Sequence, residues 1–177
     1  AAGAVEGRPV LVHAVIATPG WVGDETLDPK RSLLSELHQG AMAQRVSVPR
    51  ANLVDRPEWL SADEAACLPT AWLTAYRMLT HDSGLTAGDT VLVQGASGGV
   101  ASAAVALGRA LEMRVWVTGR SEAKRAAALE LGADAAFEPG TRLPERVDAV
   151  IETVGEATWA HSLRSLRPGG TIVCAGA

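Results

Sequence analysis

The sequence predicts an α/β fold, namely a doubly wound parallel sheet preceded by part of an antiparallel β domain. Three observations predict it. From residue 90 onward, short β-branched runs alternate with helical stretches, as in consecutive βαβ units. A glycine-rich turn at residues 94–101 joins the first of these strands to its helix. Residues 1–58 hold Val-rich fragments separated by long loops, with no clear amphipathic helix.

The second part of the chain is expected to alternate strands with helices. Strands are expected at residues 90–94, 114–118, 134–137, 147–151 and 171–174, and helices at 98–112, 121–131 and 157–166. Ser121 is expected to cap the second helix and Gly132 to end it, with Lys124 and Arg125 facing water. A turn is expected at residues 168–170. Right-handed crossovers then place helices on both faces of the sheet.

The first part of the chain is less regular. Strand fragments are expected at residues 10–15 and 44–48, and a turn at 33–37. A domain boundary near Pro57 separates a partial β domain, residues 1–58, from an α/β domain, residues 59–177. An Ala-rich stretch at residues 63–79 is expected to be helical and to break at Pro69 because proline lacks an N–H.

Composition and charge exclude several classes of protein. A hydrophobic content of 47% with a mean hydropathy of +0.12 excludes an intrinsically disordered chain. A net charge of −4 without a basic block argues against nucleic-acid binding, and no 18-residue apolar run indicates a membrane span. Cys67 and Cys174 are too few for a disulfide framework. We expect both thiols to be buried, in a reducing, cytoplasmic compartment.

The segment Gln94–Ala101, which reads QGASGGVA, predicts a dinucleotide-binding site. Glycines permit a tight turn and a close approach of a pyrophosphate, whose charge the free amides at the following helix N-terminus stabilise. Ala101 stands where the usual fingerprint has its third glycine, and alanine is small enough for close packing. The alternative is a purely structural turn.

The end of the next strand favours NADP over NAD. An NAD site usually has Asp or Glu there to bind the ribose 2′-hydroxyl. This strand ends with Thr118-Gly-Arg-Ser121, so Arg120, Ser121 and Lys124 stand where a 2′-phosphate would lie. Glu122 is the opposing charge, and we assign it to the helix dipole. The alternative is that Arg120 and Lys124 form an ordinary solvated helix start.

Several segments together resemble a known family. They are LSADEAACLP at residues 60–69, GDTVLVQGASGGV at 88–100, LGAD at 131–134 and RPGGT at 167–171. They resemble the medium-chain dehydrogenase/reductase family, in its zinc-free, quinone-oxidoreductase-like branch, and the chain looks like part of a zinc-type alcohol dehydrogenase-like protein. Residues 38–49 are similar to the end of the family's GroES-like catalytic domain.

The resemblance implies an architecture and a set of site residues. The fold would be part of a GroES-like domain, residues 1–58, joined to a Rossmann domain, residues 59–177, incomplete at its C-terminal end. A small-molecule substrate would bind between the domains, and the protein would be a homodimer. The resemblance implies four groups of residues that bind NADP(H). Near the nicotinamide they are Thr74, Ala175 and Gly176, and at the pyrophosphate they are Ser97, Gly98, Gly99 and Val100. At the 2′-phosphate they are Arg120, Ser121 and Lys124, and near the ribose they are Thr153, Val154 and Gly155.

Metal and catalytic residues are not evident. Thr70 stands where zinc-dependent relatives have a cysteine ligand, and the four histidines show no ligand spacing. We therefore expect no metal site and expect each histidine to lie on the surface or in a hydrogen bond. Tyr76 is followed four residues later by Thr80 instead of Lys, which excludes the short-chain dehydrogenase mechanism. Tyr76 is expected to face the core, so the catalytic residue is unassigned.

The function that the resemblance implies is an NADPH-dependent oxidoreductase without zinc. Hydride would pass between the nicotinamide and a quinone, an enone, an aldehyde or ketone, or an alcohol. Two alternatives remain open, a non-catalytic NADPH-binding protein of the same fold and a zinc-dependent alcohol dehydrogenase.

Overall fold

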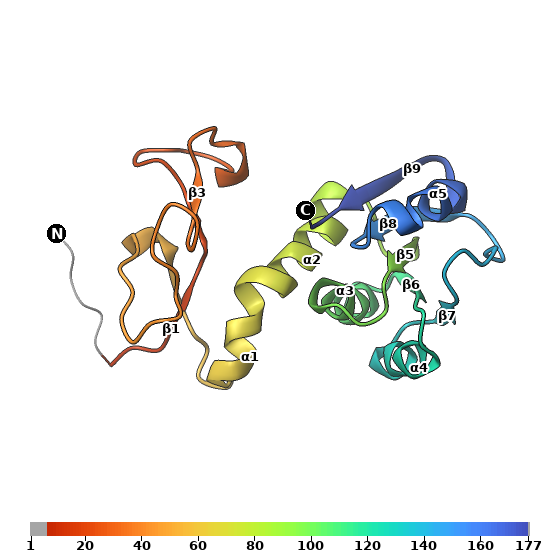
Figure 1. Ribbon diagram of the computed structural model, residues 1–177, viewed down its shortest axis with the longest axis horizontal. Coiled ribbons are helices and arrows are strands. Elements are labelled where there is room, and N and C mark those ends of the chain that lie inside the picture. Colours follow the sequence, from red (N-terminus) through yellow and green to blue (C-terminus); the bar gives the residue numbers. More distant parts are fainter. Residues whose placement is uncertain (1–6, 177) are drawn as a thin grey trace. The chain divides into compact units, whose positions relative to one another are not determined.

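The computed structural model describes residues 7–176 and divides into two compact units (Figure 1). The N-terminal unit ends at Thr70 and the C-terminal unit begins at Ala71. The domain boundary expected after residue 58 stays a prediction.

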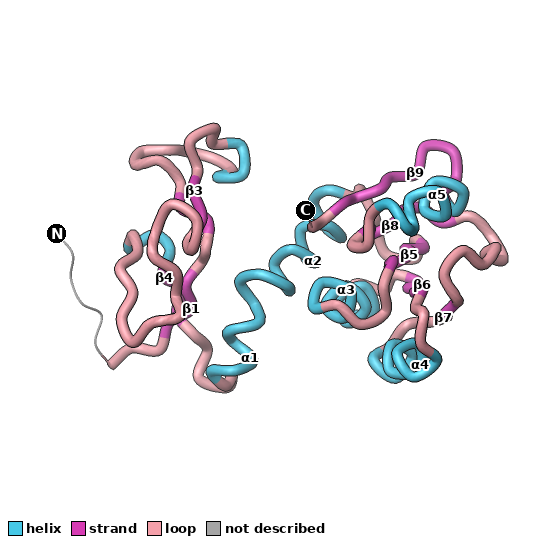
Figure 2. Tube along the Cα trace, viewed as in Figure 1, coloured by secondary structure: helices cyan, strands magenta, loops and turns pink. Residues whose placement is uncertain are grey.

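The N-terminal unit contains two short antiparallel pairs of strands (Figure 2). They are β1 (Val10–Val12) with β4 (Leu53–Asp55) and β2 (Val15–Ile16) with β3 (Ser32–Leu33), accompanied by the short helices η1 (Glu25–Leu27) and η2 (Arg50–Asn52). The buried Asn52 side chain donates to the carbonyls of His13 and Val15, so the strand expected at 10–15 divides there. The strand expected at residues 44–48 is wrong, because this mostly exposed segment forms a loop.

The Ala-rich stretch stays helical past its proline. It consists of α1 (Ala62–Cys67), η3 (Leu68–Trp72), α2 (Leu73–Arg77) and η4 (Met78–Asp82). The break expected at Pro69 is wrong, because the backbone widens into the π-helical segment η3 there. A wider turn accommodates a residue that has no N–H and clashes with the preceding turn of an α-helix.

The C-terminal unit is a five-stranded parallel sheet in the order β7-β6-β5-β8-β9. Its strands are β5 (Thr90–Gln94), β6 (Arg114–Thr118), β7 (Ala135–Phe137), β8 (Val147–Glu152) and β9 (Leu166–Cys174), and its later helices are α3 (Gly99–Ala110), α4 (Glu122–Leu131) and α5 (Glu156–Ser165). Helices α3 and α4 lie on one face and α5 on the other (Figure 1). The predicted doubly wound α/β fold is confirmed, and each predicted strand and helix of this part is present within one or two residues, apart from the early start of β9.

Alternating side chains of the strands form two cores, one on each face of the sheet. Val91 and Val93 of β5 pack in the core that α3 helps to form, whereas Leu92 packs with Trp116 in the other core. Small residues let α3 approach the sheet closely. A Cβ on Gly108 would lie 2.6 Å from a methyl group of Val115, so only glycine fits at this crossing without a shift.

The ends of α4 differ in part from expectation. Gly132 ends the helix with φ +121°, as expected for a glycine C-cap. Ser121 stands at the N-cap but its side chain makes no capping hydrogen bond. The expectation that Arg125 faces water is wrong. Its side chain is only 17% exposed, because it folds back onto the residue after β6 and donates to the carbonyl of Gly119.

Two further expectations need correction. The turn at residues 168–170 lies inside β9, where the pairing with β8 shifts register and Gly169 takes φ +78°. Cys67 and Cys174 are both exposed instead of buried. Each is the last residue of its element, where a side chain has few neighbours to cover it.

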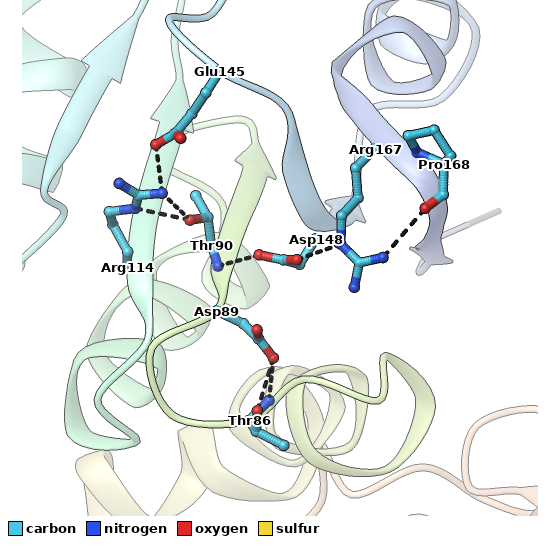
Figure 3. A network of polar contacts seen from close by, with 8 residues as sticks. All are labelled: Thr86, Asp89, Thr90, Arg114, Glu145, Asp148, Arg167 and Pro168. Atoms are coloured by element: carbon cyan, nitrogen blue, oxygen red, sulfur yellow. Dashed lines mark hydrogen bonds and ion pairs between the residues drawn. The ribbon is translucent and has the colours of Figure 1, made fainter.

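Hydrogen bonds to Asp148 connect three strands at their amino ends (Figure 3). The carboxylate accepts from the amide of Thr90 in β5, at 2.8 Å, and from the side chain of Arg167 in β9. These two bonds hold the pKa of Asp148 below its ordinary value, with a smaller opposing effect of burial. The charged form is therefore the one that the fold stabilises.

Replacing Asp148 with asparagine is expected to destabilise the protein by about 1–2 kcal/mol at neutral pH. A folded-state pKa below the ordinary value of 3.8 means that the contribution is present above that pH and is lost as the pH falls through the folded pKa. Urea unfolding at several pH values measures this, and the two proteins should converge in acid. Glu145→Gln is the control, since Glu145 forms an exposed ion pair with Arg114, of the kind that contributes little to stability. An equal loss in both variants would contradict the assignment.

Candidate dinucleotide site

The glycine-rich turn follows β5 and requires glycine at its first position. Gly95 has φ +89°, and a Cβ there would lie 3.3 Å from a Val154 methyl group and 3.6 Å from the Thr153 hydroxyl oxygen. Gly98 is the N-cap of α3 and has no side chain to bond the first amides of the helix. These amides lack intrahelical partners and are available to an anion.

A cavity of about 610 Å³ lies at the carboxyl edge of the sheet, where open α/β sheets bind ligands. It joins the glycine-rich turn, the end of β6, the start of α4 and the start of α5. The residues that line it are Gly95, Ala96, Ser97, Thr118, Gly119, Arg120, Ser121, Lys124, Pro139, Val154, Ala157 and Thr158.

The structure brings together part of the residue set that the sequence predicted. The predicted residues in the lining are Ser97, Arg120, Ser121, Lys124 and Val154. Gly98, Gly99 and Val100 continue from Ser97 into α3, and Thr153 and Gly155 flank Val154, but they are not in the lining. Thr74 lies in α2, and Ala175 and Gly176 follow β9, also outside the lining.

Several lining residues were missed by the sequence reasoning. Thr118 and Gly119 directly precede Arg120 in sequence. Their position at the end of the predicted strand could therefore have identified them. A Cβ on Gly119 would lie 2.9 Å from that of Ala96, so glycine lets the two loops meet closely. Pro139 follows β7 and Thr158 lies in α5, and no sequence motif marks either of them as a site residue.

The cavity has cationic side chains and no acidic ones in its lining. Among the described residues, the exposed side chains of Arg120 and Lys124 have neither a hydrogen-bond nor an ion-pair partner. Arg125 differs, because it is bonded to Gly119 and Glu138. Because Arg120 follows β6, Lys124 lies in the first turn of α4 and neither has a partner in the described part of the chain, this edge is suitable for a phosphate.

A buried carboxylate lies beside the cavity and was not predicted. Glu152, at the end of β8, is 2% exposed and accepts from the amides of Val154 and Gly155 at 2.8 and 3.0 Å. Burial raises the pKa of Glu152, but the hydrogen bonds from Ser162, these two amides and Thr158 outweigh it and hold the pKa below its ordinary value. Glu152 is therefore a charged acceptor that fixes the loop after β8.

Other candidate groups lie elsewhere. Within residues 7–176, no three His, Cys, Asp or Glu side chains are close enough together to hold a metal ion, and none of the helices could cross a bilayer. Tyr76 is 50% exposed, so the expectation that it faces the core is wrong; the buried residue of α2 is its neighbour in sequence, Ala75. Each histidine is hydrogen-bonded, His13 to Glu25, His38 to Ser32, His81 to Asp82 and His161 to Thr141.

Comparisons with known proteins point to one family. Residues 99–177 match the family model described as zinc-binding dehydrogenase. The chain is 37% identical to a zinc-type alcohol dehydrogenase-like protein of Leptosphaeria maculans, over 94% of this chain and 53% of that protein. The crystal structure of an NAD-dependent alcohol dehydrogenase matches with a TM-score of 0.89 and 30% identity, over 96% of this chain and 54% of that one.

The chain belongs to the medium-chain dehydrogenase/reductase family. A second relative is a probable quinone oxidoreductase of Schizosaccharomyces pombe, 34% identical over 77% of this chain and 44% of that protein. The chain spans about half the length of these curated relatives. In this chain the glycine-rich turn, the end of β6 and the loop after β8 meet at the carboxyl edge of the sheet, which is where open α/β sheets bind their ligands.

Proposed function

We propose that the C-terminal unit binds NADP(H), with the 2′-phosphate held by Arg120, Ser121 and Lys124. The observation that carries this proposal is one cavity that joins the glycine-rich turn to two cations, which have no partners within residues 7–176, and that contains no carboxylate in its lining. A carboxylate at the end of β6 would favour the free 2′-hydroxyl of NAD, whereas cations favour a phosphate.

The residues around the cavity fit the rest of a dinucleotide. Gly95, Ser97 and Gly98 leave room for a pyrophosphate beside the first amides of α3. Gly99, Val100 and their amides would complete the phosphate contacts. Thr153, Val154 and Gly155 would contact the ribose, and Thr74, Ala175 and Gly176 would lie near the nicotinamide.

We further propose that the protein is an oxidoreductase that acts on a small molecule without zinc. When bound, the nicotinamide supplies or accepts hydride. The candidate substrates are a quinone, an enone, an aldehyde or ketone, or an alcohol. Thr70 in place of a cysteine ligand supports the zinc-free reaction. We also propose that the protein is a homodimer located in the cytoplasm.

A paired titration of the purified chain with NADPH and NADH, followed by tryptophan fluorescence, tests the cofactor assignment. NADPH is expected to bind at least about tenfold more tightly, since one charge-assisted hydrogen bond contributes about 1.5–3 kcal/mol. Raising the salt concentration should weaken NADPH binding more than NADH binding, because exposed charges are screened. Equal affinities would overturn the 2′-phosphate assignment, and no binding of either would overturn the dinucleotide site.

A further inference from the structure

A chain of buried hydrogen bonds crosses three strands directly behind the candidate site. The Thr118 hydroxyl donates to Gln94 Oε1 at 2.5 Å, and Gln94 Nε2 donates to Ser162 Oγ at 2.9 Å. The Ser162 hydroxyl donates to Glu152 Oε2 at 2.6 Å. Gln94 and Ser162 are fully buried, and Thr118 and Glu152 are at most 2% exposed.

The direction of every proton in this chain is determined. A carboxylate only accepts, so Ser162 must donate to Glu152 and must accept from Gln94. His161 Nε2 lies 2.8 Å from the carbonyl oxygen of Thr141 and therefore donates to it. His161 Nδ1 is then the acceptor for the second Gln94 N–H, at 3.0 Å, so the imidazole is neutral.

Both ends of the chain hold loops of the candidate site. Gln94 precedes Gly95, and its backbone carbonyl accepts from the Thr153 hydroxyl at 2.8 Å. Glu152 accepts from the amides of Val154 and Gly155 and from the hydroxyl of Thr158. Val154 and Thr158 line the cavity. The glycine-rich turn and the loop at residues 153–155 are thus connected through Gln94, Ser162 and Glu152, whose side chains are not in the cavity lining.

We propose that Gln94 and Glu152 are positioning residues for the dinucleotide, which hold the glycine-rich turn and the 153–155 loop in the binding geometry through this one-directional chain. The inference rests on the proposed function for its ligand. Neither residue is among those expected to contact the cofactor itself. Fully satisfied polar networks of this kind specify one arrangement of their elements, whereas a single mismatched proton leaves a buried group unsatisfied.

Exchanging the two residue types tests the direction of the chain. In Gln94→Glu, two buried carboxylates compete for the one Ser162 hydroxyl. In Glu152→Gln, two amide groups donate to Ser162, whose own proton loses its acceptor. In the double variant, Gln at 152 donates to Ser162, Ser162 donates to Glu at 94, and a protonated His161 donates to the same carboxylate. Every member is satisfied again, with the direction reversed.

The experiment measures the dissociation constants of NADPH for the full 177-residue chain and its variants, together with amide hydrogen exchange at Val154 and Gly155 without cofactor. We expect Gln94→Glu to weaken binding about fivefold and Glu152→Gln about threefold, and the double variant to return to within about twofold of the wild type. The single variants should also exchange these two amides faster, and the double variant should restore their protection.

Ser165→Ala is the matched control. Ser165 is buried in α5, and its hydroxyl bonds His161, which belongs to neither loop. It should lower the melting temperature without changing the dissociation constant. The inference is wrong if the single variants bind as tightly as Ser165→Ala, or if the losses multiply in the double variant. If the wild type binds neither dinucleotide, the proposed function is wrong, and unchanged exchange at Val154 and Gly155 would separately overturn the positioning role.

Discussion

Replacing both Arg120 and Lys124 with alanine is expected to weaken NADPH binding at least about 100-fold and to leave NADH binding within about threefold. The two cofactors differ only in the 2′-phosphate, so the loss should appear only for the cofactor that has it. Neither cation has a partner to lose among the described residues, so the folded state should keep its stability. The single variants should each show part of the effect.

Fluorescence titration with both cofactors measures this difference, and thermal unfolding checks that the variants are folded. Arg142→Ala is the control, because Arg142 is an exposed cation in the same unit that lines another cavity. It removes a positive charge without touching the candidate site and should not change the preference for NADPH. A parallel loss of NADPH and NADH binding would contradict the assignment of these cations to the 2′-phosphate.

Replacing Gly95 with alanine is expected to weaken the binding of both dinucleotides at least about tenfold and to destabilise the protein by about 1–2 kcal/mol. The stability loss arises from the positive φ, which side chains with a Cβ adopt at a cost of about 1–2 kcal/mol. The binding loss has a separate cause. The new methyl group lies 3.3 Å from a methyl group of Val154, so the turn or the loop after β8 must move.

Gly88→Ala separates these two effects. Gly88 precedes β5 with φ +88°, almost the same as that of Gly95, but nothing lies within 4 Å of the position of its Cβ. Urea unfolding should therefore show a similar loss of stability in both variants, and only Gly95→Ala should lose cofactor affinity. If Gly88→Ala weakened binding equally, the contact between Gly95 and Val154 would have no role in forming the site.

Much of the C-terminal unit could be predicted from local patterns. Strand β5 is rich in β-branched residues and buried along its whole length, as expected for a strand covered on both faces. Gly132 ends α4 because a left-handed residue is needed there. The glycine-rich turn predicted a dinucleotide site, and the absence of a carboxylate at the end of β6 predicted a preference for NADP; both stay predictions. These signals lie within a few residues of one another, so a single sequence contains them.

Less of the N-terminal unit could be predicted, because its short strands depend on distant partners. Residues 44–48 contain a strand-like alternation of valines but no strand pairs with them, so they remain a loop. The break in the strand at 10–15 results from a side chain at Asn52. The β-propensity of a segment predicts neither the loop at 44–48 nor the break at 10–15, because strand formation depends on the partner strand as much as on the segment itself.

The sequence by itself determined the order of strands and helices in the C-terminal unit, the glycine-rich turn and the charges that follow β6. Only the tertiary structure decided which polar side chains are buried and what they bond. Arg125 and Lys124 look alike in sequence, yet one bonds the Gly119 carbonyl and the other stays exposed without a partner. Gln94 and Glu152 are 58 residues apart and meet through Ser162 of α5. Hydrogen bonds act over about 3 Å, so their partners are fixed only when the sheet brings distant residues together.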